Sequence, residues 1–325
     1  MIPAFSRHLS LLTLSLGFIW GTGASAQTFL DPARASSAVN PDAASQALIK
    51  SQAAAASAGL EEDNAYAPAS PGDSDLGAQL ILKRQEKSYP FRAWLDSGGY
   101  WTDNAANVSE GEIDDWFFVG GVNLSWQQQL YGRFYGDVYA GQHIYRYDSL
   151  SELDYEDGEA AAGFLVLMPE LANSILHVHY YYQRITQDIG DSAIYQTHNL
   201  KAGIQKSFLI NRLNSFNVNL TASLALDTEP DVLQRHEYSA QFGYTYKIMR
   251  DLLLGVSYRL AYYDYFNLDG RQDWYQNWGI GLTWQPYECL DITASYNFSL
   301  NESNRPAFDY EAQLAGPSLA LKFKF

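Results

Sequence analysis

Leu290-Asp-Ile-Thr-Ala-Ser-Tyr-Asn-Phe-Ser-Leu300 alternates strictly between apolar and polar residues. The even positions from Leu290 to Leu300 are apolar or aromatic, and the odd positions are Asp, Thr, Ser, Asn and Ser. Because successive side chains of a strand point to opposite faces, this run predicts a strand with one apolar and one strongly polar face. Such a strand is typical of a barrel with a lipid-facing exterior and a wet interior.

Similar runs continue on both sides of this stretch, from residue 91 to the last residue, and turn signals separate them. They predict an all-β fold, a transmembrane antiparallel up-and-down β-barrel of about 12 strands. The predicted strands are 91–102, 115–127, 132–146, 158–168, 174–186, 193–208, 213–227, 236–248, 252–265, 273–285, 289–301 and 309–325.

The connections between these runs fall into two alternating sets, as they do in outer-membrane barrels with short periplasmic turns and longer outer loops. An even number of strands also predicts that both termini lie on the periplasmic side. The short set is 128–132, 169–173, 209–212, 249–251 and 286–288, and the longer, acidic set is 103–114, 147–157, 187–192, 228–235, 266–272 and 302–308.

A soluble β-sandwich also has alternating strands, but two features disfavour it. The polar faces are rich in Ser, Thr, Asn, Gln and Gly rather than in Lys and Glu. Trp116 and Trp126 share a face about ten residues apart, as do Trp274 and Trp284. This spacing matches the length of a transmembrane strand, at both ends of which interfacial Trp is favoured. Aromatic residues make up 15% of the chain, which suits an aromatic girdle.

The N-terminal residues read as a secretory signal peptide. An apolar run from Leu9 to Trp20 is too short to span a bilayer as a helix, and Ala24-Ser-Ala26 fits an A-x-A cleavage pattern. We therefore predict a signal peptide over 1–26. Residues 27–90 begin with an Ala/Ser/Pro-rich tract, which predicts a flexible periplasmic leader, with a plug inside the barrel as the alternative.

The chain ends in Leu319-Ala-Leu-Lys-Phe-Lys-Phe325, in which Phe323 and Phe325 belong to the apolar face. This ending resembles the membrane insertion signal of Gram-negative outer-membrane β-barrel proteins, which their barrel-assembly machinery reads. The resemblance covers 91–325 and reaches the superfamily rather than a particular family. It implies an integral protein of the cell outer membrane, in contact with lipid and lipopolysaccharide.

The polar faces of the predicted strands carry charges of both signs. They predict a pore lining whose field selects solutes, or alternatively a paired network that fills a narrow barrel. Inward glycines such as Gly121 and Gly279 favour the open pore, although glycine also marks strand kinks. The predicted pore-lining residues are Arg92, Asp96, Arg133, Asp137, His143, His177, His179, Lys201, Lys247, Arg259, Asp291, Lys322 and Lys324.

Several other chemistries are disfavoured by the sequence. The formal net charge of −16 leaves no basic stripe for nucleic acid, and the single Cys289 excludes a multi-cysteine metal site. His198 is predicted to face outward near the outer rim, where outer-membrane lipid hydrolases place a His and a Ser, but no Ser lies two residues after it. His177 and His179 share a face without a carboxylate on the same run. We expect no catalytic residues, no resident metal and no cofactor.

The segment from Asp148 to Glu159 is rich in carboxylates, which could bind Ca²⁺ or Mg²⁺ and bridge to lipopolysaccharide phosphate. The function that the sequence favours is a porin-like channel for passive diffusion of small polar solutes. The alternative is a structural or export-associated barrel that partners surface-polymer or secretion machinery.

Overall fold

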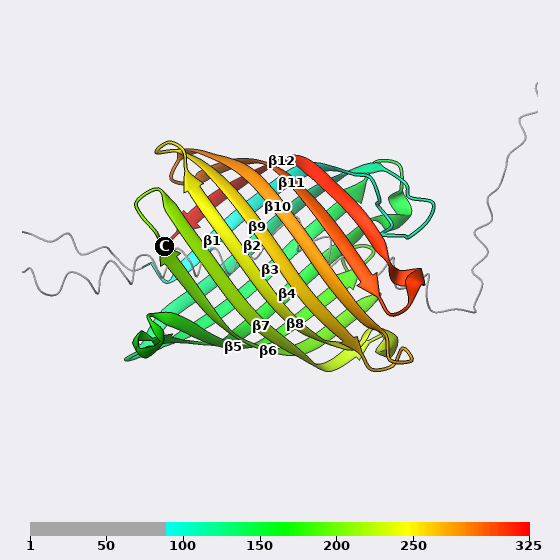
Figure 1. Ribbon diagram of the computed structural model, residues 1–325, viewed down its shortest axis with the longest axis horizontal. Coiled ribbons are helices and arrows are strands. Elements are labelled where there is room, and N and C mark those ends of the chain that lie inside the picture. The colour runs from blue at the N-terminus through cyan, green and yellow to red at the C-terminus, as the bar shows by residue number, and fades with distance from the viewer. Residues whose placement is uncertain (1–88) are drawn as a thin grey trace, which may run out of the picture.

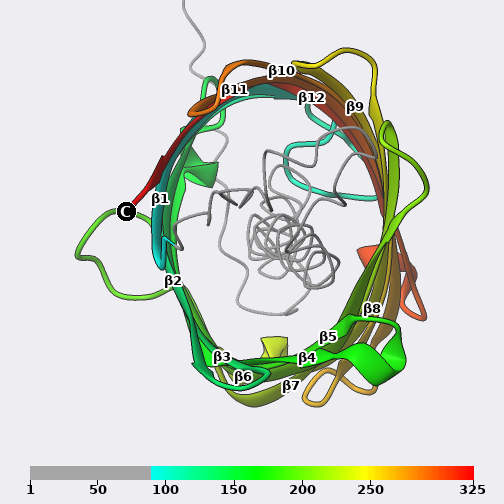
Figure 2. The same cartoon turned by 90° about the vertical axis from the view of Figure 1, so that its left-hand side faces the viewer.

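The computed structural model describes residues 89–325, which form a closed barrel of twelve antiparallel strands (Figures 1 and 2). Within this range no helix is long and apolar enough to cross a bilayer. The strands are β1 (Phe91–Thr102), β2 (Asp115–Tyr131), β3 (Phe134–Tyr147), β4 (Tyr155–Met168), β5 (Ser174–Thr186), β6 (Tyr195–Leu209), β7 (Asn214–Glu229), β8 (Arg235–Lys247), β9 (Leu252–Tyr265), β10 (Gln272–Tyr287), β11 (Leu290–Ser303) and β12 (Tyr310–Lys324).

Each strand pairs with its neighbours in the chain, and β1 closes the barrel against β12. The closing register runs from Arg92 opposite Lys324 to Thr102 opposite Leu314. The backbones of Phe91 and Phe325 exchange two hydrogen bonds of 3.2 and 3.0 Å beyond that ladder. Because the sheet has no free edge, its strands can satisfy one another's backbone groups even in lipid.

The predicted fold class and strand number are confirmed. The strand ends differ from the prediction by a few residues: β2 continues to Tyr131, and β4 begins at Tyr155 rather than at 158. Two of the predicted loop acids, Glu156 and Asp157, therefore belong to a strand. The signal peptide and all but the last two residues of the leader, including its role as a plug, lie outside the described residues.

The two ends of the barrel differ as predicted. The long-loop end carries the connections 103–114, 148–154, 187–194, 230–234, 266–271 and 304–309, with the short 3-10 helices η1 (Ser151–Leu153), η3 (Asp231–Leu233) and η4 (Pro306–Phe308). The turn end carries shorter connections and η2 (Pro169–Leu171), together with the start of β1 and the end of β12.

The outer face of the barrel is apolar and aromatic. Trp116 pairs with Trp101, and Tyr262 lies between Tyr238 and Trp274 in register. All five rings lie near the long-loop ends of their strands. The Tyr238 and Tyr262 rings stack with centroids 6.5 Å apart. An aromatic belt of this kind suits the boundary between lipid and water.

One irregularity changes the direction of a side chain. His198 pairs with Asp227, but Asn199 pairs with Ala225, so Leu226 is an extra residue in β7. This bulge puts Asp227 opposite the outward His198, although strict alternation along 213–227 predicts that Asp227 faces inward.

Candidate channel interior

The polar face of the strands forms the inside of the barrel. The strand register places most predicted pore-lining residues on this inner face, and their role in selecting solutes stays a prediction. The residues placed there are Arg92, Asp96, Asp137, His143, His177, His179, Lys201, Lys247, Arg259, Asp291, Lys322 and Lys324.

Arg133 is the exception, because it lies in a turn rather than on a strand. The two-residue connection between β2 and β3 contains Arg133, which is exposed and forms an ion pair with Glu170 in the next turn. The Arg133 guanidinium holds the pKa of the Glu170 carboxyl below its usual range. The short turn takes Arg133 out of the strand alternation on which the prediction depended.

A first inner-face cluster joins β1, β2 and β3. Asn123 donates to Asp96 through its Nδ2 atom at 2.7 Å, and His143 Nε2 lies 3.5 Å from the same Asp96 oxygen. Asp96, Gly121 and His143 are in register across the three strands. A Cβ atom on Gly121 would lie 2.2 Å from the His143 ring, so glycine leaves the gap through which the two side chains meet.

A second cluster repeats this arrangement on β3, β4 and β5. His179 Nε2 lies 2.9 Å from Asp137 Oδ2, and Gly163 is in register between them. The His177 ring lies 5.7 Å from that of His179. The pattern along β5 does not reveal the carboxylate beside these histidines, because Asp137 comes from β3, two strands away.

A third cluster surrounds Glu159 on β4. The hydroxyl groups of Tyr139 and Tyr181 both donate to the Glu159 carboxylate, and the Lys201 ammonium lies 3.2 Å from the centre of the Tyr181 ring. Farther toward the long-loop end, the two carboxylate oxygens of Asp157 accept hydrogen bonds from Gln183 Nε2, at 3.1 and 3.0 Å. Glu159 and Asp157 therefore accept hydrogen bonds from neutral side chains.

On the opposite side of the barrel the charged residues are paired directly. Arg259 on β9 donates to Glu237 on β8 at 2.6 Å. Near the turn end Lys322 forms an ion pair with Asp291. At Gly121 and Gly163, side chains of neighbouring strands lie in the space that a side chain would otherwise fill.

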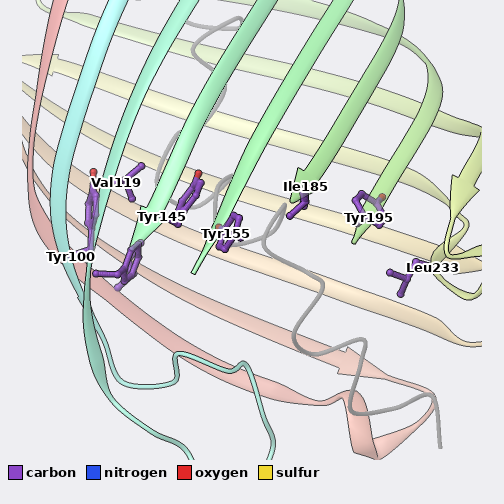
Figure 3. Close-up of a cluster of buried hydrophobic side chains, with 9 residues drawn as sticks. Tyr100, Val119, Tyr145, Tyr155, Ile185, Tyr195 and Leu233 are labelled. Atoms are coloured by element: carbon purple, nitrogen blue, oxygen red, sulfur yellow. The ribbon is translucent and has the colours of Figure 1, made fainter. Parts of the chain in front are cut away.

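Toward the long-loop end the inner face changes from polar to aromatic. Figure 3 shows Tyr145, Tyr155, Ile185 and Tyr195, which come from four consecutive strands and lie in one row. The Tyr145 and Tyr155 rings stack with centroids 4.2 Å apart. A second group on β9, β10 and β12 contains Tyr263, Tyr265, Tyr275 and Tyr310.

The loop 103–114 is fastened at this mouth by Asn104, which is 1% exposed. The Asn104 Nδ2 atom donates to the carbonyl oxygens of Val108 and Glu311, both at 2.8 Å, and its Oδ1 atom accepts from Val108 N–H at 3.0 Å. Asn104, Ala105 and Asn107 line a cavity together with Tyr275 and Ser299 of the inner face. In Figure 2 the loop lies within the outline of the strand ring.

The carboxylates predicted to form one acidic loop are divided between two places. Asp148, Glu152 and Asp154 lie in or beside η1, whereas Asp157 and Glu159 belong to the inner face of β4. Across residues 89–325 no three His, Cys, Asp or Glu side chains gather in a way that could hold a metal ion. Binding of Ca²⁺ or Mg²⁺ at the loops stays a prediction.

His198 faces outward, as predicted, beside two tyrosines. The His198 Nδ1 atom lies 2.5 Å from the Tyr180 hydroxyl oxygen, and the centres of the Tyr182 and His198 rings are 4.8 Å apart. These contacts describe a hydrogen-bonded surface histidine and give no support to an acyl-transfer site.

No family model and no curated protein matches this sequence. Among solved structures, an outer-membrane channel from Pseudomonas putida F1 aligns with a TM-score of 0.53 and 12% identity over 73% of this chain and 97% of that one. The NanC porin aligns with a TM-score of 0.43 and 8% identity over 71% and 100% of the two chains. The KdgM porin in complex with disordered oligogalacturonate has a TM-score of 0.39, 8% identity, and coverage of 71% and 99%. The first of these similarities shows a shared fold.

Proposed function

We propose that this protein is an integral outer-membrane channel through which small polar solutes diffuse passively, without a catalytic step. The observation that carries the proposal is a closed twelve-stranded barrel with an apolar outer face and a charged inner face. Barrels of about eight strands are filled by side chains, whereas those of about 16–18 strands leave a water-filled channel. Twelve strands suit a narrow pore whose lining charges select the solute.

In this proposal the turn end and both termini face the periplasm, and the long loops face outward toward lipopolysaccharide. Outer-membrane barrels share this arrangement of short turns and long loops. Phe323 and Phe325 serve as the insertion signal for the barrel-assembly machinery, and both side chains are exposed on the outer face.

The test is single-channel conductance of the purified protein in planar bilayers, with and without residues 27–85. Stable current steps from both forms would support a diffusion pore. Steps from the shortened form alone would make the leader a plug. The absence of steps from both forms would contradict the channel and favour the alternative below.

The alternative is a structural or export-associated barrel that binds a periplasmic or surface-polymer partner through the leader. The inner-face contacts favour it, since Asp96, Asp137 and Glu159 are each held by side chains of other strands. A scaffold predicts a closed pore and a protein that copurifies with the full chain but not with the chain that lacks residues 27–85.

A further inference from the structure

Charge is segregated along the axis of the barrel. The six connections of the long-loop end are rich in carboxylates, such as Glu110, Glu112 and Asp114 in the loop 103–114. Their basic residues are Arg271 and Arg305. Both arginines are paired with aspartates, Arg271 with Asp273 at 2.5 Å and Arg305 with Asp269 at 3.4 Å. The mouth formed by these loops is therefore strongly negative.

The turn end has the opposite character. Arg212 and Arg250 are exposed in its connections, and Lys247 and Lys324 end their strands on the inner face. Lys206 adds a further cation beside the turn 169–173, where it donates to the Ala172 carbonyl. The carboxyl side chains of this end are Glu170, Asp251, Glu288 and Asp291, which the cations outnumber, and Glu170 and Asp291 form ion pairs with Arg133 and Lys322.

We infer that this protein conducts ions asymmetrically, passing cations preferentially from the long-loop end to the turn end and anions in the reverse direction. The inference rests on the proposed channel function. In the proposed orientation, the conductance is larger when the voltage drives cations toward the periplasm and anions away from it.

The physical reason is that each mouth concentrates its own counter-ion. A potential of about one kT at a mouth changes the local concentration of a monovalent ion by about threefold. A voltage that drives cations in through the negative mouth and anions in through the positive mouth fills the pore with both carriers. The reverse voltage draws both carriers out of the pore, and the current falls.

The experiment measures current–voltage curves of the full-length mature protein in planar bilayers, first in 0.1 M and then in 1 M KCl. The Debye length falls from about 10 Å to about 3 Å between these concentrations. We expect a larger current in 0.1 M KCl when the long-loop side is positive, and nearly symmetric curves in 1 M KCl. Cys289 is exposed in the turn between β10 and β11, so a membrane-impermeant thiol label reports which side that end faces.

Two variants remove charge from one mouth at a time. The triple variant Glu110→Gln, Glu112→Gln, Asp114→Asn should reduce the ratio of the currents at opposite voltages by about half, because it removes part of the field at the negative mouth. The double variant Arg212→Gln, Arg250→Gln should also lower that ratio while it raises the preference for cations. Two matched controls keep the charges and should leave the ratio unchanged. One is the triple variant Glu110→Asp, Glu112→Asp, Asp114→Glu, and the other is the double variant Arg212→Lys, Arg250→Lys.

The outcomes separate this inference from the channel function. Symmetric current in 0.1 M KCl, or asymmetry of the opposite sign, would overturn the inference while the channel stands. Asymmetry that survives 1 M KCl or the charge removals would also overturn it, since the cause would then be shape rather than charge. Absence of conductance would overturn the channel function and the inference together.

Discussion

Two carboxylate–histidine contacts of the inner face, Asp96–His143 and Asp137–His179, depend on a glycine between the two side chains. Asp96 and His143 come from strands separated by another strand, and adjacent strands are about 4.8 Å apart, so their Cα atoms are about 10 Å apart. The residue in register between them is Gly121, and any side chain there would block the approach. Gly163 has the same place between Asp137 and His179.

Gly121→Ala should therefore destabilise the barrel. The new methyl group would lie 2.2 Å from His143 Cδ2 and 3.0 Å from Asp96 Oδ2, so the buried cluster must rearrange. Overpacking of this kind costs about 1–3 kcal/mol. We expect a lower temperature for the shift from the folded to the unfolded band on a denaturing gel.

Gly255→Ala is the matched control, because Gly255 also lies on an inner strand face and its nearest neighbour would be 3.9 Å from the new Cβ atom. Its folded band should persist to the temperature of the unchanged protein. Equal losses in the two variants would mean that glycine is needed for strand curvature rather than for the Asp96–His143 contact.

Among the loops, 103–114 is distinguished by its anchoring at the mouth. Three hydrogen bonds of the Asn104 side chain close the loop on itself and fasten it to β12, and Gln313 N–H donates to Asp103 at 2.6 Å beside them. The acidic half of the loop, with Glu110 and Glu112, remains exposed. The anchor therefore holds negative charge over the pore.

Asn104→Ala should release this loop. Each lost hydrogen bond contributes about 0.5–1.5 kcal/mol, and the Val108 and Glu311 carbonyl groups lose their Asn104 donor. A protease that cleaves after glutamate should then cut at Glu110 or Glu112 several times faster than in the unchanged protein. Ser109→Ala, in the exposed part of the same loop, should leave the cleavage rate unchanged, and equal rates for all three proteins would show that Asn104 does not hold the loop.

The closure of the barrel brings the chain's last strand against its first described strand. β12 pairs with β11 on one side and with β1 on the other, so the barrel is complete only after the C-terminal residues have been placed. Phe323 and Phe325 point outward from this closing strand. As the proposed insertion signal, Phe323 and Phe325 would be accessible before β12 pairs with β1.

Phe325→Ser should reduce the amount of folded protein in the outer membrane at least severalfold, because the predicted insertion signal loses its terminal aromatic ring. The measurement is the yield of heat-modifiable protein in outer-membrane fractions. Lys324→Gln, on the inner face of the same strand, should keep the normal yield. A normal yield of Phe325→Ser would mean that the terminal ring does not guide assembly.

Much of the architecture follows from local sequence. Alternation with period two, the short turns and the acidic loops predicted the strand number, the two unlike ends and the outward Trp116 and Trp274, since each of these depends on residues close together in the chain. The outward place of Asp227 was missed because one extra residue, Leu226, reverses every later position of the strand.

Local sequence does not predict the side-chain contacts inside the barrel. Arg133 was assigned to the inner wall because the start of β3 was predicted at 132 rather than at Phe134, and its partner Glu170 lies in another turn. His179 and Asp137 are separated by 42 positions and meet across Gly163. Pattern along one strand specifies which face a side chain occupies, whereas its partners depend on the register between strands, and that register exists only in the closed barrel.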